Sequence, residues 1–346
     1  MTSHRRELLS LDEVREAARA YGLRRPIQAE PIGRGSRRSA KGRLVTPDGR
    51  FLLKRRAADE RVVRGLRFVH ALQLHLADRG SPVARILPAR DGTTAVPASS
   101  GVLELFAWID GTRWSGSVAE AAEVGAALGA MLDASRSFAA PPDAPSRSFH
   151  GAVAAGDACA RIVAAACAAD PDTDAGALGA TVGALLARTS LATERARAEG
   201  IDAGARQCIH GDLHPGNVLF SEGRLAAFLD FDGARVDHRA CEVANALVHF
   251  GNHSMAGLPE DQWKVELDLA RIAAVLGGLR RSLEVPLSPA ERRAIPWLMI
   301  ESCTLESIAP VAASGRFVHL RADRFLPFIE RKTAWIESSA AWLSSC

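Results

Sequence analysis

Short apolar runs separated by turns dominate the first third of the chain and predict strands. We expect these strands at 26–32, from residue 44 onward, and at 51–54, 83–87, 94–96 and 102–106. Two helices accompany them. Ser10 and Glu13 have the spacing of a capping box, which opens a helix that ends near residue 21, and apolar residues recur at helical spacing across 57–80. This part of the chain therefore predicts a small sheet with few helices.

Beyond residue 111 the apolar positions change to the period of a helix. We expect helices at 117–138, 151–169, 175–187, 191–199, 239–250, 259–281, 288–312 and 325–343. A chain of 346 residues is long enough for two domains or two lobes. Strands followed by helices predict an α+β fold.

The stretch 208–232 interrupts the helices with a polar hairpin. Its pattern predicts a short apolar strand, a polar loop, a second strand, a turn at 221–223 and a third strand. Because Asp and Asn are poor strand formers, packing alone does not explain their density here. The polar side chains expected to converge on one small volume are His210, Asp212, His214, Asn217, Asp230 and Asp232.

Composition narrows the class of protein without identifying a site. A hydrophobic content of 47% and a charged content of 24% are ordinary for a soluble protein, and a net charge of +3 is too weak to indicate a nucleic-acid partner. No apolar run long enough for a membrane span and no signal peptide is apparent, so we expect a cytoplasmic protein without a membrane partner. The six cysteines are scattered, which favours neither disulfides nor a zinc site. The oligomeric state is left open.

The spacing within the hairpin resembles that of a known family. Asp212 and Asn217 lie five residues apart, as do the Asp and Asn of the protein-kinase catalytic loop, and Asp230-Phe231 falls where that fold has its metal-binding Asp-Phe-Gly. With Gly211 in place of Arg and Asp232 in place of Gly, the pattern resembles the aminoglycoside phosphotransferase and choline kinase family, which includes homoserine-kinase-like and spore-coat-kinase-like members.

The resemblance implies a two-lobed, protein-kinase-like fold with a small antiparallel N-terminal lobe and a mainly helical C-terminal lobe. The division that it implies is an N-terminal helix at 1–25, a nucleotide-binding lobe at 26–106, and a helical lobe at 107–346 that contains the catalytic hairpin 207–232.

The resemblance also implies the roles of the central residues. Asp212 would accept the proton of a substrate hydroxyl, while Asn217 and Asp230 would supply hard oxygen ligands to Mg²⁺. Lys54 would contact the α- and β-phosphates of ATP. Of the 43 Lys and Arg residues only four are lysines, and Lys54 lies on an apolar strand, which makes it worth singling out.

The remaining assignments are weaker in the sequence. Gly35 and Ser36 belong to a glycine-containing turn expected over the phosphates, and the backbone near Glu104 and Phe106 is expected to bind adenine. Supporting roles fall to three residues: His210, which would brace the loop through hydrogen bonds, Asp232, which would orient Asp212 or assist the metal, and Glu242, which would bond the loop backbone.

Two residues and one partner are left unassigned. His214 would be either a neighbour of the metal site or a substrate contact, and His249 is interpreted as a cap or surface residue. Kinases pair the lysine with an acid on the following helix, but none occurs from 61 to 77. The candidate partners for Lys54 are Glu60, His70 and Gln73.

The resulting hypothesis is a Mg-ATP-dependent phosphotransferase that acts on a hydroxyl of a small molecule. One alternative is a catalytically silent nucleotide-binding module, which the missing helix acid favours. A second is a metallophosphoesterase, since 211–214 and 251–253 resemble two of the metal motifs of that class, although the middle motif is absent.

The sequence does not identify the acceptor. An aromatic content of 5% disfavours a choline cage, and an aminoglycoside is possible without support. A sugar, an amino alcohol or another metabolite fits equally well. The acids on the expected substrate side are spread along the chain and are interpreted as solvated helix residues: Asp237, Glu242, Glu260, Asp261, Glu301 and Glu306.

Overall fold

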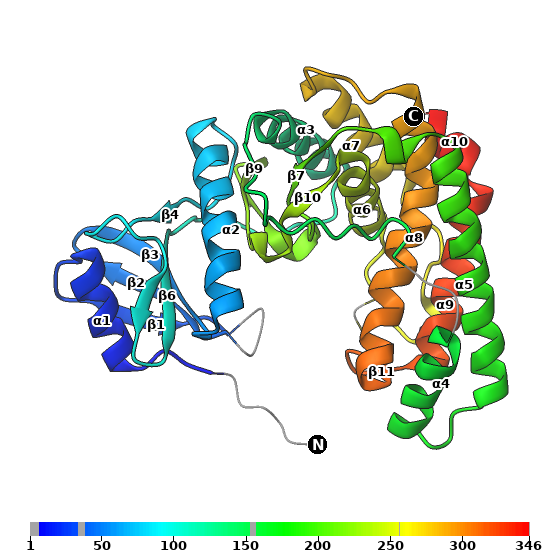
Figure 1. The fold of residues 1–346 in the computed structure, drawn as a ribbon, viewed down its shortest axis with the longest axis horizontal. Coiled ribbons are helices and arrows are strands. Elements are labelled where there is room, and N and C mark those ends of the chain that lie inside the picture. The colour runs from blue at the N-terminus through cyan, green and yellow to red at the C-terminus, as the bar shows by residue number, and fades with distance from the viewer. Residues whose placement is uncertain (1–6, 34–38, 153–156, 256, 346) are drawn as a thin grey trace.

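The computed structural model describes residues 7–33, 39–152, 157–255 and 257–345. Figure 1 shows a small sheet with α1 and α2 at one end, short hairpins in the middle, and long helices at the other end. The predicted order of a strand-rich part followed by a helical part is therefore correct. Gly35 and Ser36 lie outside the described residues.

The small lobe is built on an antiparallel sheet with strand order β1-β2-β3-β6-β4, in which β5 also pairs with β6. Its strands are β1 (Gln28–Pro31), β2 (Lys41–Thr46), β3 (Gly49–Arg56), β4 (Ile86–Leu87), β5 (Val96–Ala98) and β6 (Gly101–Ala107). The helix α1 (Leu11–Tyr21) begins at the predicted capping box and packs Val14 and Ala17 into the same apolar cluster as the sheet. The helix set apart at 1–25 thus packs as part of the small lobe.

The helix α2 (Glu60–Asp78) joins the two lobes through its apolar face. Phe68, Leu72 and Leu76 are buried in the large hydrophobic cluster of the helical lobe, and not in the cluster beneath the sheet. This packing fixes the position of the sheet relative to the central hairpins.

Two short antiparallel pairs form the centre of the molecule. β7 (Arg206–Ile209) pairs with β10 (Arg235–His238), and β8 (Val218–Ser221) pairs with β9 (Arg224–Phe228). The turn between β8 and β9 has positive φ at Glu222 and Gly223, as two-residue hairpin turns require. The three predicted strands are present, and β10 is an additional strand that the sequence pattern did not indicate.

The large lobe contains mainly helices, which are α3 (Val118–Ser135), α4 (Ala158–Ala169), α5 (Ala175–Ala198), α6 (Arg239–Gly251), α7 (Leu269–Ser282), α8 (Pro289–Ser314), α9 (Ala322–Ser338) and α10 (Ala340–Ser345). The strands β11 (Arg316–Phe317) and β12 (Leu320–Arg321) connect α8 to α9. Glycines allow α3 and α7 to approach closely, because a Cβ at Gly125 would lie 1.9 Å from the carbonyl oxygen of Val275.

Several predicted helix boundaries are wrong. The helix predicted from 151 begins at Ala158, and the one predicted at 325–343 is divided into α9 and α10. Residues 175–187 and 191–199 form a single helix, since the hydroxyl of Thr189 donates to the carbonyl of Leu185 and the helix continues through it. The helix predicted from 259 begins at Leu269, because Asp268 caps it by accepting from the amide of Arg271.

Among the described residues, α5 alone has the length and composition of a membrane span. It packs against α8 and α9, and Arg188 within it pairs with Glu330 and Glu337. The contacts of α5 are thus those of a helix within the large lobe.

Candidate active site

The central hairpins bring three of the predicted site residues together. Asp212 follows β7, Asn217 ends a 3₁₀ turn just before β8, and Asp230 follows β9. The side-chain amide of Asn217 donates to the carbonyl oxygen of Asp212 at 2.8 Å and to its Oδ2 at 3.2 Å. Leu229, the residue before Asp230, donates its amide to the carbonyl of Asn217 at 2.9 Å. One small network therefore fixes the relative positions of the loop and the strand end.

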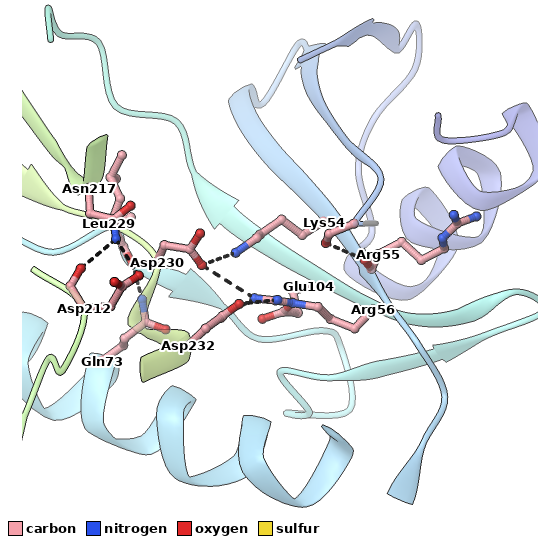
Figure 2. Close-up of polar contacts among 12 residues, drawn as sticks. Lys54, Arg55, Arg56, Gln73, Glu104, Asp212, Asn217, Leu229, Asp230 and Asp232 are labelled. Atoms are coloured by element: carbon pink, nitrogen blue, oxygen red, sulfur yellow. Dashed lines mark hydrogen bonds and ion pairs between the residues drawn. The ribbon is translucent and has the colours of Figure 1, made fainter. Parts of the chain in front are cut away.

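Lys54 reaches this network from β3. Its Nζ lies 3.0 Å from Oδ1 of Asp230, and Figure 2 shows it pointing from the sheet toward Asp230, with Asp212 and Asn217 beyond. Burial by itself would raise the pKa of Asp230, but the charges of Lys54 and Arg56 outweigh it and lower that pKa. Asp230 has φ +61, a conformation that residues other than glycine rarely adopt and that tends to occur at functional sites.

None of the three candidate partners contacts Lys54. Glu60 pairs with Arg64, Gln73 donates to the carbonyl of Ala84, and His70 bonds Glu104 through Nε2 at 2.8 Å. The residue that pairs with Lys54 in the structure is Asp230, and none of the three candidates does.

The buried acid near Lys54 is on a strand instead of a helix. Glu104, 1% exposed, lies opposite Lys54 in the β3–β6 register and bonds His70 and Arg56. Burial would raise its pKa, yet His70, Arg56 and Lys54 together lower it. Sequence reasoning proposed Glu104 for its backbone and missed its side chain, because it looked for the acid on α2.

Arg56 forms a second connection between the lobes. Its guanidinium bonds Glu104 of the sheet and both carboxylate oxygens of Asp232 in the large lobe. Asp232, expected to orient Asp212 or assist a metal, therefore has a cation from the small lobe as its partner. The pairs Lys54–Asp230 and Arg56–Asp232 both connect the lobes beside the same cavity.

A cavity of about 280 Å³ lies between the lobes. It continues past β6 along the connection at residues 107–111. Phe106 forms part of its wall, with its ring centroid 5.8 Å from Nζ of Lys54. The polar and charged residues of its lining are Lys41, Lys54, Arg56, Gln73, Glu104, Arg113, Asn217, Asp230 and Asp232.

His210 and Glu242 fix the backbone of the loop that carries Asp212. His210 is buried, donates from Nε2 to the carbonyl of Leu229 at 2.8 Å, and accepts at Nδ1 from the amide of Asp212. Burial lowers its pKa to about 4, so the ring is neutral. Glu242 accepts from the amide of Gly211 at 2.7 Å, and burial raises the pKa of Glu242 to about 7. Its Oε1 has no hydrogen-bond partner among the residues that the structure describes.

Gly211 stands where protein kinases have an arginine, and its surroundings leave no space for a side chain. Its φ is +76, and a Cβ there would lie 2.1 Å from the carbonyl oxygen of Gly233. The close approach of the two hairpins therefore requires glycine at this position.

Sequence reasoning missed a second group of residues beside Asp212. His214 accepts the amide of Gly216 at Nδ1, its Nε2 lies 3.8 Å from Oδ2 of Asp212, and its ring lies 5.7 Å from that of His249. His249 in turn pairs with Glu306 of α8 at 2.8 Å. The interpretation of His249 as a cap or surface residue is wrong, because its side chain is only partly exposed and contacts this polar cluster. Glu306 is exposed on α8, as expected, and belongs to the same cluster. The interpretation as solvated helix residues is wrong for Asp237, Glu242 and Glu301, which are buried.

This cluster acts on the pKa of Asp212. Burial raises the pKa of the Asp212 carboxyl, His214 and His249 lower it, Glu306 raises it, and the net shift is upward. Nothing in the spacing of His249 and Glu306 signals this contact, because it depends on the packing of α6 against α8.

A second cavity, of about 610 Å³, lies on the side of the large lobe. Gly211 lines this cavity, whereas Gly216 and Asn217 line the first, so the loop that carries Asp212 separates the two. The other lining residues are Arg147, Ser148, Phe149, Ala152, Arg235, Asn245, Ser302, Leu305 and Glu306.

The chain is similar to known proteins in sequence and in fold. Residues 28–281 match the phosphotransferase enzyme family. A homoserine kinase of Gluconacetobacter diazotrophicus is 31% identical in an alignment of 241 residues that covers 66% of this chain and 64% of that protein, so the chain spans slightly less than two thirds of this relative.

Two solved structures share the fold. An aminoglycoside phosphotransferase of Alicyclobacillus acidocaldarius subsp. acidocaldarius has a TM-score of 0.64 at 16% identity and covers 99% of each chain. An amicoumacin kinase in complex with AMP-PNP, Ca²⁺ and Ami has a TM-score of 0.63 at 16% identity, over 94% of this chain and 92% of its own. The expected two-lobed, kinase-like fold is confirmed, and because the family match extends over most of the chain, this protein belongs to the phosphotransferase enzyme family.

Proposed function

We propose that this protein transfers the γ-phosphate of ATP, with Mg²⁺, to a hydroxyl group of a small molecule. The observation that carries the proposal is that the loop with Asp212 lies between two cavities, while Asn217, Asp230 and Lys54 line the first of them. Phosphoryl transfer requires neutralised phosphate charge, an acceptor held in line and a base for its proton. The two cavities provide separate places for the donor and the acceptor.

In this proposal the first cavity binds the nucleotide. Lys54 bonds the phosphates, as its position on β3 and its pairing with Asp230 favour, and adenine lies against the connection at 107–111. Glu104 and Phe106 line the same cavity, but their backbone is paired within the sheet, so a base bound by backbone groups meets the chain at the end of β6. The match to the phosphotransferase enzyme family supports this use of the cavity.

The residues beside Lys54 fit a magnesium ion. The amide nitrogen of Asn217 faces Asp212, which leaves the amide oxygen available, and the side chain of Asp230 is 38% exposed with a lowered pKa. Mg²⁺ prefers hard oxygen ligands and takes one or two protein groups together with phosphate oxygens. When bound, it would neutralise charge on the β- and γ-phosphates.

Asp212 is the base in this proposal. Its carboxylate is held by Asn217 and lies on the loop that faces the second cavity, where the acceptor would bind. His210 and Glu242 hold the loop backbone, so the direction of the carboxylate does not depend on the substrate. The proton of the acceptor hydroxyl passes to Asp212 as the oxygen attacks the γ-phosphate.

The site also bears on the two alternatives. The esterase would need His253 with Asp212 and His214, but the ring nitrogen Nδ1 of His253 lies 3.4 Å from the guanidinium of Arg271. The silent module was favoured by the missing helix acid, and the acids near Lys54 come instead from β6, at Glu104, and from the end of β9, at Asp230. Both observations favour an active phosphotransferase over the esterase and the silent module.

The test is release of ADP from Mg-ATP with a panel of hydroxylated metabolites and antibiotics, with Asp230→Ala as the blank. Acceptor-dependent ADP release that is lost in this variant is the expected result. Thermal stabilisation by Mg-ATP without any ADP release would support the silent module instead. Phosphate release from an aryl phosphate with Mn²⁺ would support the esterase.

A further inference from the structure

The charges of the second cavity are not balanced. Among its lining residues, Glu306 is paired with His249, while Arg235 is occupied by Asp237 and by two backbone carbonyls of the central hairpins. Arg147 is exposed and has no hydrogen bond or ion pair with any residue that the structure describes. The cavity therefore presents one uncompensated guanidinium.

The segment that carries Arg147 is fixed on both sides of it. The amide of Val236 donates to the carbonyl of Pro145 at 2.7 Å, which joins the segment to β10. On the other side, the amide of Gly151 donates to buried Glu301 at 3.0 Å. Arg147 is thus part of a fixed wall of the cavity.

We propose that Arg147 binds a carboxylate on the acceptor, whose hydroxyl then reaches Asp212. This rests on the proposed function and names the class of its acceptor: a small hydroxylated acid or amino acid, not a polycation. A guanidinium matches a carboxylate with two parallel hydrogen bonds, which gives orientation as well as affinity. A polycationic antibiotic would instead meet a like charge at this wall.

L-homoserine is a suitable probe because it carries both a carboxylate and a primary hydroxyl, and L-homoserine amide is its neutral counterpart at that position. We would measure kcat and KM for both acceptors with wild type, Arg147→Met, Arg147→Lys and Arg161→Met. Arg161 is an exposed arginine of α4 that pairs with Asp157 and does not line the cavity, so it is the matched control.

The expected result is a KM for L-homoserine at least about tenfold higher in Arg147→Met, with a smaller change in kcat, since one charge-assisted contact is lost. Arg147→Lys should recover part of the affinity, Arg161→Met should match wild type, and the KM for the amide should not depend on residue 147. A KM for L-homoserine that is unchanged in Arg147→Met overturns the inference.

Other outcomes separate this inference from the proposed function. If the wild type phosphorylates the amide or an uncharged or cationic alcohol better than the acid, the inference is overturned and the kinase activity stands. If no acceptor in the panel gives ADP release above the Asp230→Ala blank, the proposed function fails, and this inference fails with it.

A separate observation concerns the first cavity. Lys41 on β2 is the direct cross-strand partner of Lys54 on β3, and both side chains line the cavity. Like charges directly opposite each other in an antiparallel pair are destabilising, and their Cβ atoms are about 4.5–5.5 Å apart. In a chain with four lysines, two of them occupy this one pair of positions.

We further propose that Lys41 binds the phosphates of the nucleotide together with Lys54. A polyphosphate chain in this cavity would be attracted by both ammonium groups. The proposal also rests on the nucleotide occupying this cavity. Lysine provides a compact point charge on a flexible stem, which suits a phosphate chain better than a planar carboxylate.

Binding measurements test it without any acceptor. Dissociation constants for Mg-ATP and for adenosine would be compared in wild type, Lys41→Met and Lys264→Met, since Lys264 is an exposed lysine outside the cavity. We expect Lys41→Met to weaken Mg-ATP about tenfold and to leave adenosine unchanged, because adenosine has no phosphates. Equal Mg-ATP affinity in Lys41→Met and wild type overturns the proposal for Lys41. If wild type binds neither Mg-ATP nor adenosine, the proposed nucleotide site itself is wrong.

Discussion

The two cavities differ in how the chain builds them. The charged residues beside the first cavity come mostly from two short stretches, 41–56 and 212–232. The second cavity takes Arg147 from a connecting segment, Asn245 from α6, and Ser302 and Glu306 from α8. The parts that any phosphoryl transfer needs are therefore close together in sequence, and the parts that would select an acceptor are scattered.

This difference has a physical reason. A hairpin fixes the distance between a loop and the end of the next strand through its own hydrogen bonds, so Asp212, Asn217 and Asp230 are positioned by local geometry. The wall of the second cavity depends instead on how α6 and α8 pack, and many different sequences give similar helix packing. Selectivity can thus change without disturbing the reaction centre.

The largest expected effect tests the boundary between the cavities. Asp212→Ala should lower kcat by about 10³-fold or more, because general-base catalysis is lost, while Mg-ATP affinity stays within about twofold. Steady-state kinetics and calorimetric titration with Mg-ATP would check the two parts. Loss of nucleotide binding in a folded Asp212→Ala variant would place Asp212 in the nucleotide site and contradict separate sites for donor and acceptor.

How far the sequence could predict this site follows from the same contrast. The motif spacing and the strand pattern were enough to predict the positions of Asp212, Asn217, Asp230 and Lys54. The position of Glu104 opposite Lys54 could not be predicted, because it depends on the register of β3 with β6. The fold was predictable in outline, whereas helix boundaries set by a single side chain, as at Thr189, were not.

The next prediction concerns the nucleotide side alone. Lys54→Met should reduce kcat/KM for ATP by about 10²-fold, since it removes a cation from the phosphates and leaves Asp230 without its 3.0 Å partner. The KM for the acceptor should change little. Lys264 is exposed, and Lys264→Met is the matched control. An equally large rise in the KM for the acceptor would show that the two cavities are energetically coupled.

Glu242 supports the loop that both cavities share, and it should make stability depend on pH. Burial raises the pKa of Glu242 to about 7 from 4.5, so between these values the unfolded chain loses a proton that the folded protein keeps. Stability is therefore highest below the unfolded value and falls as pH rises through this window, by about 3 kcal/mol in total.

Glu242→Gln isolates this contribution because glutamine does not titrate. The free energy of unfolding of wild type relative to Glu242→Gln, measured in urea at pH 4.5 and pH 8, should fall by about 3 kcal/mol. Parallel pH dependence in the two proteins would mean that Glu242 has the same pKa folded and unfolded.

The smallest effect is expected on the acceptor side, from His249→Gln. His249 lowers the pKa of Asp212, and its removal also leaves Glu306, which raises that pKa, without a cation. Both changes raise the pKa of Asp212, so the acidic limb of the kcat–pH profile should move to higher pH. Since an ion pair of this exposure is worth about 0.2–1 kcal/mol, kcat on that limb should fall about 1.4- to fivefold. The KM for ATP should be unaffected, and exposed His319→Gln should behave as wild type. A shift of the acidic limb to lower pH would show that His249 and Glu306 do not act on Asp212 through charge, and the cluster would then belong to acceptor binding alone.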